Sequence, residues 1–216
     1  MKPLILTGYT HHIKPIAEFC LPSKAAWAER HGCRLITLSD SNFPPEHGHP
    51  SFQKLRWIRH HLENDEPVIW LDADSMITRP AIQPELLLPQ PPYILGVSRD
   101  YADGGRPEWL RWSAGNMAWL PHERSFEWLD KAMQNEGARW GGLWDQDALQ
   151  SCQPACAVQF YQPRFMNAVL PEFGYPASWK PGDFLVHFTG IAPEDRLAAA
   201  NRFVETHLKL DLATGA

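Results

Sequence analysis

The sequence predicts an α/β fold with a mainly parallel central sheet flanked by helices. Short apolar stretches alternate with longer helix-forming stretches, which is the order that builds a parallel sheet. Residues 68–71 are apolar without interruption, as expected for a strand that is covered on both faces. This stretch ends at Asp72 and Asp74, and ligands of open α/β sheets bind at the carboxyl ends of the strands.

The chain has 216 residues, a formal net charge of −5 and a pI near 6.0. Because this length allows one sizeable core, we expect one domain spanning residues 1–216. The acidic balance argues against a nucleic-acid partner and favours a small molecule. The N-terminus lacks the features of a signal peptide, and no stretch approaches the roughly 20 apolar residues of a transmembrane helix. We therefore expect no transmembrane segment and a cytoplasmic location.

Residues 3–6 predict the first strand, and the loop that follows contains Thr7, Gly8 and Tyr9. In a doubly wound sheet this loop lies beside the ligand crevice. Tyr9 is therefore a candidate to stack on a base, although an exposed loop tyrosine explains it equally well.

Residues 13–31 predict two helical pieces that are separated at Pro22. Ser23 is the expected N-cap of the second piece, and Gly32 is expected to end it. Residues 34–39 predict the next strand.

Ser51 is expected to cap a helix, because apolar side chains recur after it at spacings of three and four: Phe52, Leu55, Ile58 and Leu62. Lys54 lies off this apolar stripe. Since the helix directly precedes the strand that ends in Asp72, Lys54 is a candidate for contact with a diphosphate, and a solvated lysine is the alternative.

Asp72 and Asp74 point to the same side of an extended chain. They could share one cation, or one carboxylate could bind the metal and the other a sugar hydroxyl.

Further strands are predicted at residues 93–98, 117–120, 158–161 and 184–188. Helices are predicted at 123–134 and 194–208, and residues 141–147 are expected to open another helix. The polar stretch 99–107 is a candidate lid. Asp145 and Asp147 repeat the Asp-x-Asp pattern at a helix start, where carboxylates interact favourably with the helix dipole. This repetition shows that the pattern alone does not identify a function.

Six of the ten tryptophans fall between residues 109 and 144. Tryptophan in such a stretch most often belongs to the core, because it buries a large area. Flat aromatic faces also suit sugar rings, so one or two of these side chains are candidates for an acceptor platform.

The strand end at Asp72 and Asp74 and a late strand ending near His187 together indicate an oxygen-rich metal site with one imidazole. A lone histidine after an apolar strand is ordinarily a core residue, so its place in the site depends on the two aspartates. The four cysteines are too sparse for a zinc pattern. This mixture of ligands favours Mn²⁺ or Mg²⁺.

Four motifs in order resemble those of the retaining, GT-A-type (Rossmann-like) glycosyltransferases. The resemblance is strongest to the galactosyl-, mannosyl- and xylosyltransferase family that includes fungal galactosyltransferases and plant xyloglucan xylosyltransferases, and glycogenin is more distantly similar. It runs from about Lys24 to Ile191, and its motifs are Ser51–Asp74, Ser113–Asn116, Trp144–Gln146 and Gly182–Gly190. The resemblance implies a nucleotide-binding half at about residues 1–110 and a donor-sugar and acceptor half at about 111–216.

The resemblance also implies roles for individual residues. Asp72, Asp74 and His187 would bind the metal, and Asp72 would also contact the donor. Lys54 would contact its diphosphate or sugar. The catalytic pair would be Asp145 and Gln146, with Gln146 near the anomeric carbon. Other donor contacts would come from three loops or strand ends and comprise Thr7, Gly8, Tyr9, Ser113, Gly115 and Asn116.

The implied reaction moves a hexose or pentose from a nucleotide-diphosphate sugar, a UDP-sugar, to a hydroxyl acceptor such as a glycan, with retention at the anomeric carbon. Two positions depart from the family pattern. Ser113 stands where the family usually has Asn, and Ala192 stands where some members carry a basic residue.

Two other classes remain open. A magnesium-dependent phosphohydrolase of the haloacid dehalogenase type also ends a strand in Asp-x-Asp. That family has Thr or Val where this chain has Met76, and its motif lies nearer the N-terminus. A non-catalytic carbohydrate-binding module would explain the tryptophans but not the carboxylates.

Overall fold

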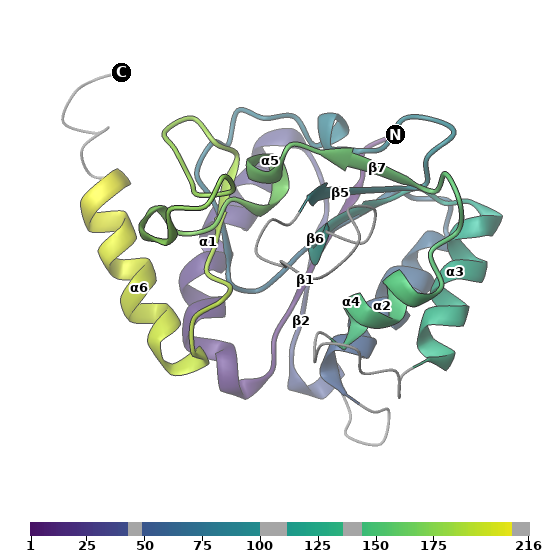
Figure 1. Cartoon of the computed structure of the whole chain (residues 1–216), viewed down its shortest axis with the longest axis horizontal. Coiled ribbons are helices and arrows are strands. Elements are labelled where there is room, and N and C mark those ends of the chain that lie inside the picture. The colour runs from purple at the N-terminus through teal and green to yellow at the C-terminus, as the bar shows by residue number, and fades with distance from the viewer. Residues whose placement is uncertain (43–48, 100–111, 136–143, 209–216) are drawn as a thin grey trace.

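The computed structural model describes residues 1–42, 49–99, 112–135 and 144–208, and its centre is a six-stranded sheet (Figure 1). The strand order is β2-β1-β3-β6-β5-β7. The strands are β1 (Leu4–Gly8), β2 (Leu35–Leu38), β3 (Val68–Leu71), β5 (Leu95–Arg99), β6 (Trp112–Trp119) and β7 (Val158–Tyr161). Only β6 runs against the others among these strands, so the predicted α/β fold with a mainly parallel sheet is confirmed.

A second, two-stranded sheet lies beyond the carboxyl end of β3 and pairs β4 (Ser75–Ile77) with β8 (Leu185–His187). The two strands are antiparallel, and Ser75 pairs with His187. This register places a residue from late in the chain directly beside the segment that follows β3.

Helices cover both faces of the large sheet (Figure 1). On one face lie three helices: α2 (Pro50–Leu62), α3 (Glu123–Gln134) and α4 (Asp145–Ser151). On the other lie α1 (Lys14–His31) and α5 (Pro163–Asn167), while α6 (Arg196–Phe203) packs with α1 over the small sheet. Short 3₁₀ turns, including His11–Ile13 and Pro193–Asp195, border the carboxyl edge.

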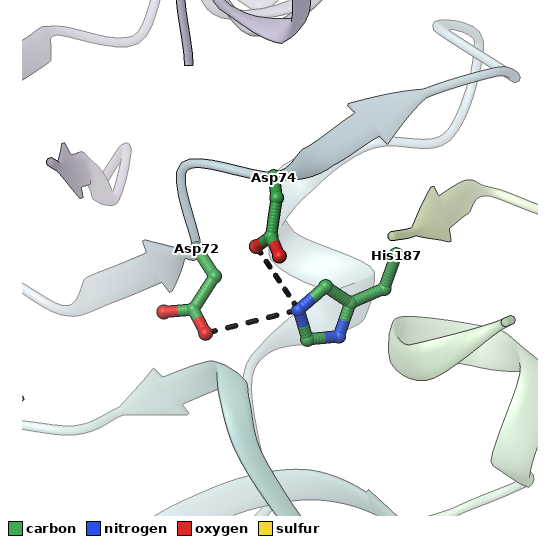
Figure 2. Close-up of side chains that lie close together, drawn as sticks. All are labelled: Asp72, Asp74 and His187. Atoms are coloured by element: carbon green, nitrogen blue, oxygen red, sulfur yellow. Dashed lines mark ion pairs between the residues drawn. The ribbon is translucent and has the colours of Figure 1, made fainter. Parts of the chain in front are cut away.

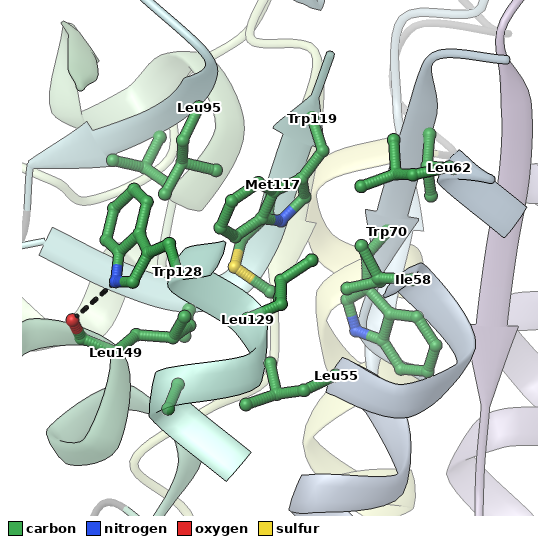
Figure 3. Close-up of a cluster of buried hydrophobic side chains, with 14 of the residues drawn as sticks. Leu55, Ile58, Leu62, Trp70, Leu95, Met117, Trp119, Trp128, Leu129 and Leu149 are labelled. Carbon is green, nitrogen blue, oxygen red and sulfur yellow. Dashed lines mark hydrogen bonds between the residues drawn. The ribbon is translucent and has the colours of Figure 1, made fainter. Parts of the chain in front are cut away.

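The core between the sheet and the face formed by α2, α3 and α4 contains the fully buried tryptophans Trp112, Trp119 and Trp128. Figure 3 shows Trp119 and Trp128 in this core. The indole Nε1 of Trp128 donates a hydrogen bond to the Leu149 carbonyl at 2.9 Å, which satisfies its polar group inside the core. These three tryptophans are therefore core residues, which is the more common role that the sequence predicted for tryptophan in this stretch. Trp109 and Trp140 lie outside the described residues.

The predicted break in the first helix is wrong, because α1 continues through Pro22. Proline cannot donate to the carbonyl of Glu18, four residues earlier. Both residues are exposed, so water can satisfy that carbonyl. Ser23 is not a cap: its Oγ donates to the Cys20 carbonyl and accepts from the Ile77 amide. Gly32 ends the helix in the left-handed conformation, with φ of 64°, as predicted.

Two other local predictions need correction. The N-cap of α2 is His49, whose Nδ1 accepts from the Ser51 amide, so Ser51 lies inside the helix. The predicted short strand at 117–120 is the second half of β6, which begins at Trp112. The candidate lid at 99–107 falls almost wholly outside the described residues. In the part of the chain that the structure describes, no helix is both long and apolar enough to cross a membrane.

Candidate metal and ligand site

The site forms where β3 leaves the large sheet. The Asp72 amide donates to the Gly115 carbonyl at 2.9 Å, and the Ser75 amide donates back to the Asp72 carbonyl at 3.0 Å. This tight turn carries the chain from β3 into β4. Asp74 therefore sits directly before β4, and the pairing of β4 with β8 brings His187 next to it.

The three predicted metal ligands come together at this turn (Figure 2). The Nε2 atom of His187 lies 3.2 Å from Oδ1 of Asp74 and 3.8 Å from Oδ2 of Asp72. One ligand atom from each of the three residues lies within 4.8 Å of the other two. Two carboxylate oxygens and one imidazole nitrogen form a donor set that suits Mg²⁺ or Mn²⁺ better than a thiol-rich site would.

The surroundings of His187 fit metal binding. Its Nδ1 lies 2.7 Å from Oδ1 of Asn167, and both side chains are buried. Because an amide oxygen only accepts, Nδ1 carries a proton, and Nε2 is the ring nitrogen that faces the two carboxylates and would bind a metal. Gly115 adds a second constraint: a Cβ there would lie 2.4 Å from Cε1 of His187 and 3.0 Å from Oδ2 of Asp72.

Asp74 is surrounded by positive or hydrogen-donating groups. Its Oδ2 lies 2.7 Å from Nη1 of Arg196, while Lys24 donates to the neighbouring Ala73 carbonyl at 3.0 Å. Burial alone would raise the pKa of Asp74, but His187, Arg196 and Lys24 outweigh burial and hold that pKa well below its usual range. Asp74 is therefore ionised and able to bind a cation, even though it is only 4% exposed.

Lys54 is buried rather than solvated, so the predicted alternative of a surface lysine is wrong. Its Nζ lies 2.7 Å from Oδ2 of Asp145 and 3.5 Å from Oδ1 of Asp72, and it donates to the Ala114 carbonyl at 2.9 Å. Burial opposes its charge, but the two carboxylates raise its pKa overall. Lys54 thus links the Asp72 strand end to the start of α4.

Asp145 is the buried partner of this lysine. Burial raises its pKa, and the Asp72 charge adds to that effect, while the charge of Lys54 acts in the opposite direction. Asp145 and Asp72, the first residues of the two Asp-x-Asp patterns, therefore meet at one cation.

These side chains line a cavity of about 700 Å³ at the carboxyl edge of the sheet. Its wall includes Gly8 and Tyr9 from the loop after β1, Trp144 before α4, and Arg196 at the start of α6. This volume lies within the range of small-molecule sites. The position agrees with the rule that ligands of α/β sheets bind at strand carboxyl ends.

Five other predicted site residues are not among those that line the cavity: Thr7, Ser113, Gly115, Asn116 and Gln146. Two of these side chains brace the strands. Oε1 of Gln146 accepts from the Ala114 amide at 2.9 Å, and Oδ1 of Asn116 accepts from the Asp72 amide at 3.2 Å and the Ser75 hydroxyl at 3.0 Å. Contact of these five residues with a donor stays a prediction.

Sequence reasoning missed three residues of this site: Lys24, Asn167 and Arg196. Each belongs to a different helix. Asn167 contacts His187, Arg196 contacts Asp74, and Lys24 donates to the carbonyl between the two aspartates. Lys24 and Arg196 are cations on α1 and α6, and Asn167 ends a five-residue helix. None carries a local sequence motif, so only the three-dimensional arrangement identifies them.

The fold and this cavity define an α/β domain whose mainly parallel sheet carries an Asp-x-Asp turn at its carboxyl edge. No protein-family model matches the sequence, and no curated protein matches it. Solved structures do match.

One matching structure is a glycosyltransferase involved in the glycosylation of the major capsid of PBCV-1. Its TM-score is 0.71 at 16% sequence identity, over 94% of this chain and 100% of that chain. Mouse xyloside xylosyltransferase 1 matches with a TM-score of 0.51 at 14% identity, over 87% of this chain and 97% of that one. The bifunctional glycosyltransferase WbbM matches with a TM-score of 0.59 at 14% identity, and this chain covers 44% of it. At these identities the likeness establishes the GT-A fold of glycosyltransferases.

Proposed function

We propose that this protein is a metal-dependent glycosyltransferase that moves a hexose or pentose from a UDP-sugar to a hydroxyl acceptor, such as a glycan, with retention. The observation that carries the proposal is the convergence of Asp72, Asp74 and His187 in a small-molecule cavity of a GT-A fold. The fold supplies the class of enzyme, and the carboxylate-imidazole cluster supplies a reason for metal dependence.

Asp72, Asp74 and His187 would hold Mn²⁺ or Mg²⁺, which supplies Lewis-acid neutralisation of the charge on the departing diphosphate. Asn167 keeps Nε2 of His187 directed at the carboxylates. Lys54 adds a fixed positive charge beside Asp72 and keeps the buried carboxylate of Asp145 in place.

The donor has two proposed contacts in the cavity wall. Tyr9, in the loop after β1, is available to stack on the base. Asp145 lines the cavity, and Asp145 and its neighbour Gln146 are proposed to lie along the donor sugar. Trp70 and Trp144 also line the cavity, and Trp144 is the proposed sugar-ring platform. We assign the acceptor to the part of the cavity that Trp144 lines.

Retention has two routes in this site. In same-face attack, the bond between the anomeric carbon and the phosphate oxygen breaks as the acceptor oxygen bonds to that carbon. The acceptor proton then passes to the departing phosphate oxygen. In the second route the carboxylate of Asp145 or of a neighbour bonds to the anomeric carbon as the bond to the diphosphate breaks. The acceptor oxygen then displaces that carboxylate, and the acceptor proton passes to the released diphosphate. Mass spectrometry of protein mixed with donor alone distinguishes the routes, since only the second adds a glycosyl mass to the protein.

The test is incubation with a panel of nucleotide sugars, with and without Mn²⁺, followed by measurement of UDP or GDP release. We expect metal-dependent release that falls by about two orders of magnitude or more in Asp74→Asn, because that change removes a charged ligand from the metal. Asp65→Asn alters an exposed carboxylate remote from the cavity and is the matched control.

Other outcomes identify other functions. Phosphate release from a phosphoester without nucleotide release would indicate a phosphohydrolase. Sugar binding without turnover would indicate a binding module. Full metal-dependent turnover in Asp74→Asn would overturn the metal assignment, even if the protein is a glycosyltransferase.

A further inference from the structure

Each carboxylate of the Asp-x-Asp turn has His187 near one oxygen and a cationic side chain near the other. Asp72 directs one carboxylate oxygen toward His187 and the other toward Lys54. Asp74 likewise directs Oδ1 toward His187 and Oδ2 toward Arg196. A cation therefore lies on the outer side of each carboxylate, and the metal-ligand atoms lie between the two pairs.

The two cations differ in how many of their donors the chain uses. A lysine ammonium has three donors, and Nζ of Lys54 faces three oxygens, on Ala114, Asp72 and Asp145. An arginine guanidinium has five donors. Among the described residues, that of Arg196 contacts two oxygens: Nε donates to the Ile191 carbonyl at 3.1 Å and Nη1 to Oδ2 of Asp74 at 2.7 Å.

Arg196 also has access to a ligand. Its side chain is 20% exposed and lines the cavity, whereas that of Lys54 is 8% exposed. The remaining N–H groups of the guanidinium are therefore the cationic donors that a molecule in the cavity can reach. Their planar fork matches the oxygens of a phosphate group.

The net charge of the cavity points to the same ligand. Its fixed charges are the carboxylates of Asp72, Asp74 and Asp145 and the cations of Lys54 and Arg196. With a divalent metal added, the cavity becomes positive by one formal charge, which favours a doubly negative diphosphate diester. Without Arg196 the loaded cavity would be formally neutral, so this arginine supplies the excess positive charge.

We propose that Arg196 binds the diphosphate of the donor directly, through the N–H groups that it does not use toward Asp74 and Ile191. The inference rests on the proposed function, because it takes the ligand to be a nucleotide-diphosphate sugar. It assigns Lys54 to positioning the Asp72 and Asp145 carboxylates, and Arg196 to contact with the phosphate oxygens.

Calorimetric titration of the 216-residue chain tests this inference without turnover. Wild type, Arg196→Gln and Arg196→Lys are each titrated with Mn²⁺ alone and then, in the Mn²⁺-loaded state, with inorganic pyrophosphate, UDP and uridine. Arg202→Gln alters an exposed arginine on the same helix outside the cavity and is the matched control.

We expect Arg196→Gln to bind pyrophosphate and UDP about 10- to 100-fold more weakly, the range for losing charge-assisted hydrogen bonds. Uridine affinity should stay within about twofold. Mn²⁺ affinity should stay the same or rise, because a cation beside Asp74 has been removed. Arg196→Lys should recover part of the pyrophosphate affinity, since the charge is kept and the fork is lost.

A purely structural arginine gives a different pattern. If Mn²⁺ affinity falls in step with pyrophosphate affinity, or if pyrophosphate affinity in Arg196→Gln stays within about twofold of wild type, the inference is wrong. These binding results are independent of turnover. Wild-type protein that binds pyrophosphate through Arg196 but releases no nucleotide from any sugar donor would refute the proposed function alone.

Discussion

His187 is oriented by one buried neighbour, Asn167, through a contact of 2.7 Å between Nδ1 and the amide oxygen. Without that acceptor the imidazole could rotate or place its proton on Nε2, and either change removes the lone pair that faces Asp72 and Asp74. Partners of this kind commonly contribute a factor of about 10 to 100 to metal affinity.

We therefore predict that Asn167→Ala lowers Mn²⁺ affinity about 10- to 100-fold. Calorimetric titration with Mn²⁺ measures this change, and circular dichroism checks that the variant is folded. Asn64→Ala, at an exposed turn after α2, is the control and should bind Mn²⁺ like wild type. Equal Mn²⁺ affinity in Asn167→Ala and wild type would show that Asn167 does not orient the ligand.

Lys24 is a buried lysine on α1 that contacts the turn between Asp72 and Asp74. It is 1% exposed, and its Nζ donates to the Ala73 carbonyl. Burial lowers its pKa below the ordinary value of 10.5, although the Cys20, Asp74 and Asp72 charges act in the opposite direction. A lysine with a lowered folded-state pKa destabilises the folded protein while it is protonated, and this cost disappears as the pH rises toward 10.5.

We expect the free energy of unfolding of Lys24→Met at pH 7 to lie between the wild-type value and about 2 kcal/mol above it, because burial of the charge is avoided. The difference should narrow as the pH rises from the lowered pKa of Lys24 toward 10.5, because wild type gains stability over that range. Urea titrations at several pH values measure it. A variant that is clearly less stable at pH 7 would show that the pairing of Lys24 with Ala73 and Asp74 outweighs the burial cost.

At the scale of elements, the starts of α2 and α4 are joined by one ring contact. His49, the N-cap of α2, stacks on Trp144, the residue before α4, with ring centroids 3.8 Å apart and planes 3° from parallel. Trp144 has a positive φ of 48°, which is unfavourable for a bulky residue. The stack therefore helps to hold a strained residue at the cavity wall.

We predict that His49→Ala lowers the free energy of unfolding by about 1–3 kcal/mol, because it removes both a helix cap and an aromatic contact. Urea unfolding at pH 8, followed by tryptophan fluorescence, measures the loss. His60→Ala, an exposed position on the same helix, should change the free energy by less than about 0.5 kcal/mol. A loss as small as that of His60→Ala would mean that the stack contributes little.

The elements were predictable where one local pattern decides the structure. The helix Glu123–Gln134 and the strand Val158–Tyr161 have the predicted bounds, because their apolar periodicity and flanking turn residues agree. Pro22 misled the prediction because its position is exposed, where the lost hydrogen bond costs less than breaking a helix with buried residues on both sides. Tertiary packing, which the local sequence does not contain, decided that case.

At the scale of the whole molecule, the site joins segments from both ends of the chain. The loop after β1 and the start of α6 line the same cavity, and His187 meets Asp74 through the register of β4 and β8. The sequence indicates that both strands end in polar residues, but not which strands pair. The positions of Asp72, Asp74 and His187 were therefore predictable, whereas Arg196 depended on how α6 packs.

This long-range assembly implies that metal binding stabilises the fold, since an unfolded chain does not hold three ligands together. Mn²⁺ at about 100 times its dissociation constant should add about 2.7 kcal/mol, which corresponds to a rise in Tm of about 5–10 °C for a chain of this size. Thermal unfolding by circular dichroism measures the rise, and excess EDTA should reverse it. Asp74→Asn should lose most of the rise, whereas Asp65→Asn should keep it. If Mn²⁺ raises the Tm of Asp74→Asn as much as that of wild type, the ion binds elsewhere, and the carboxylate turn after β3 is not its site.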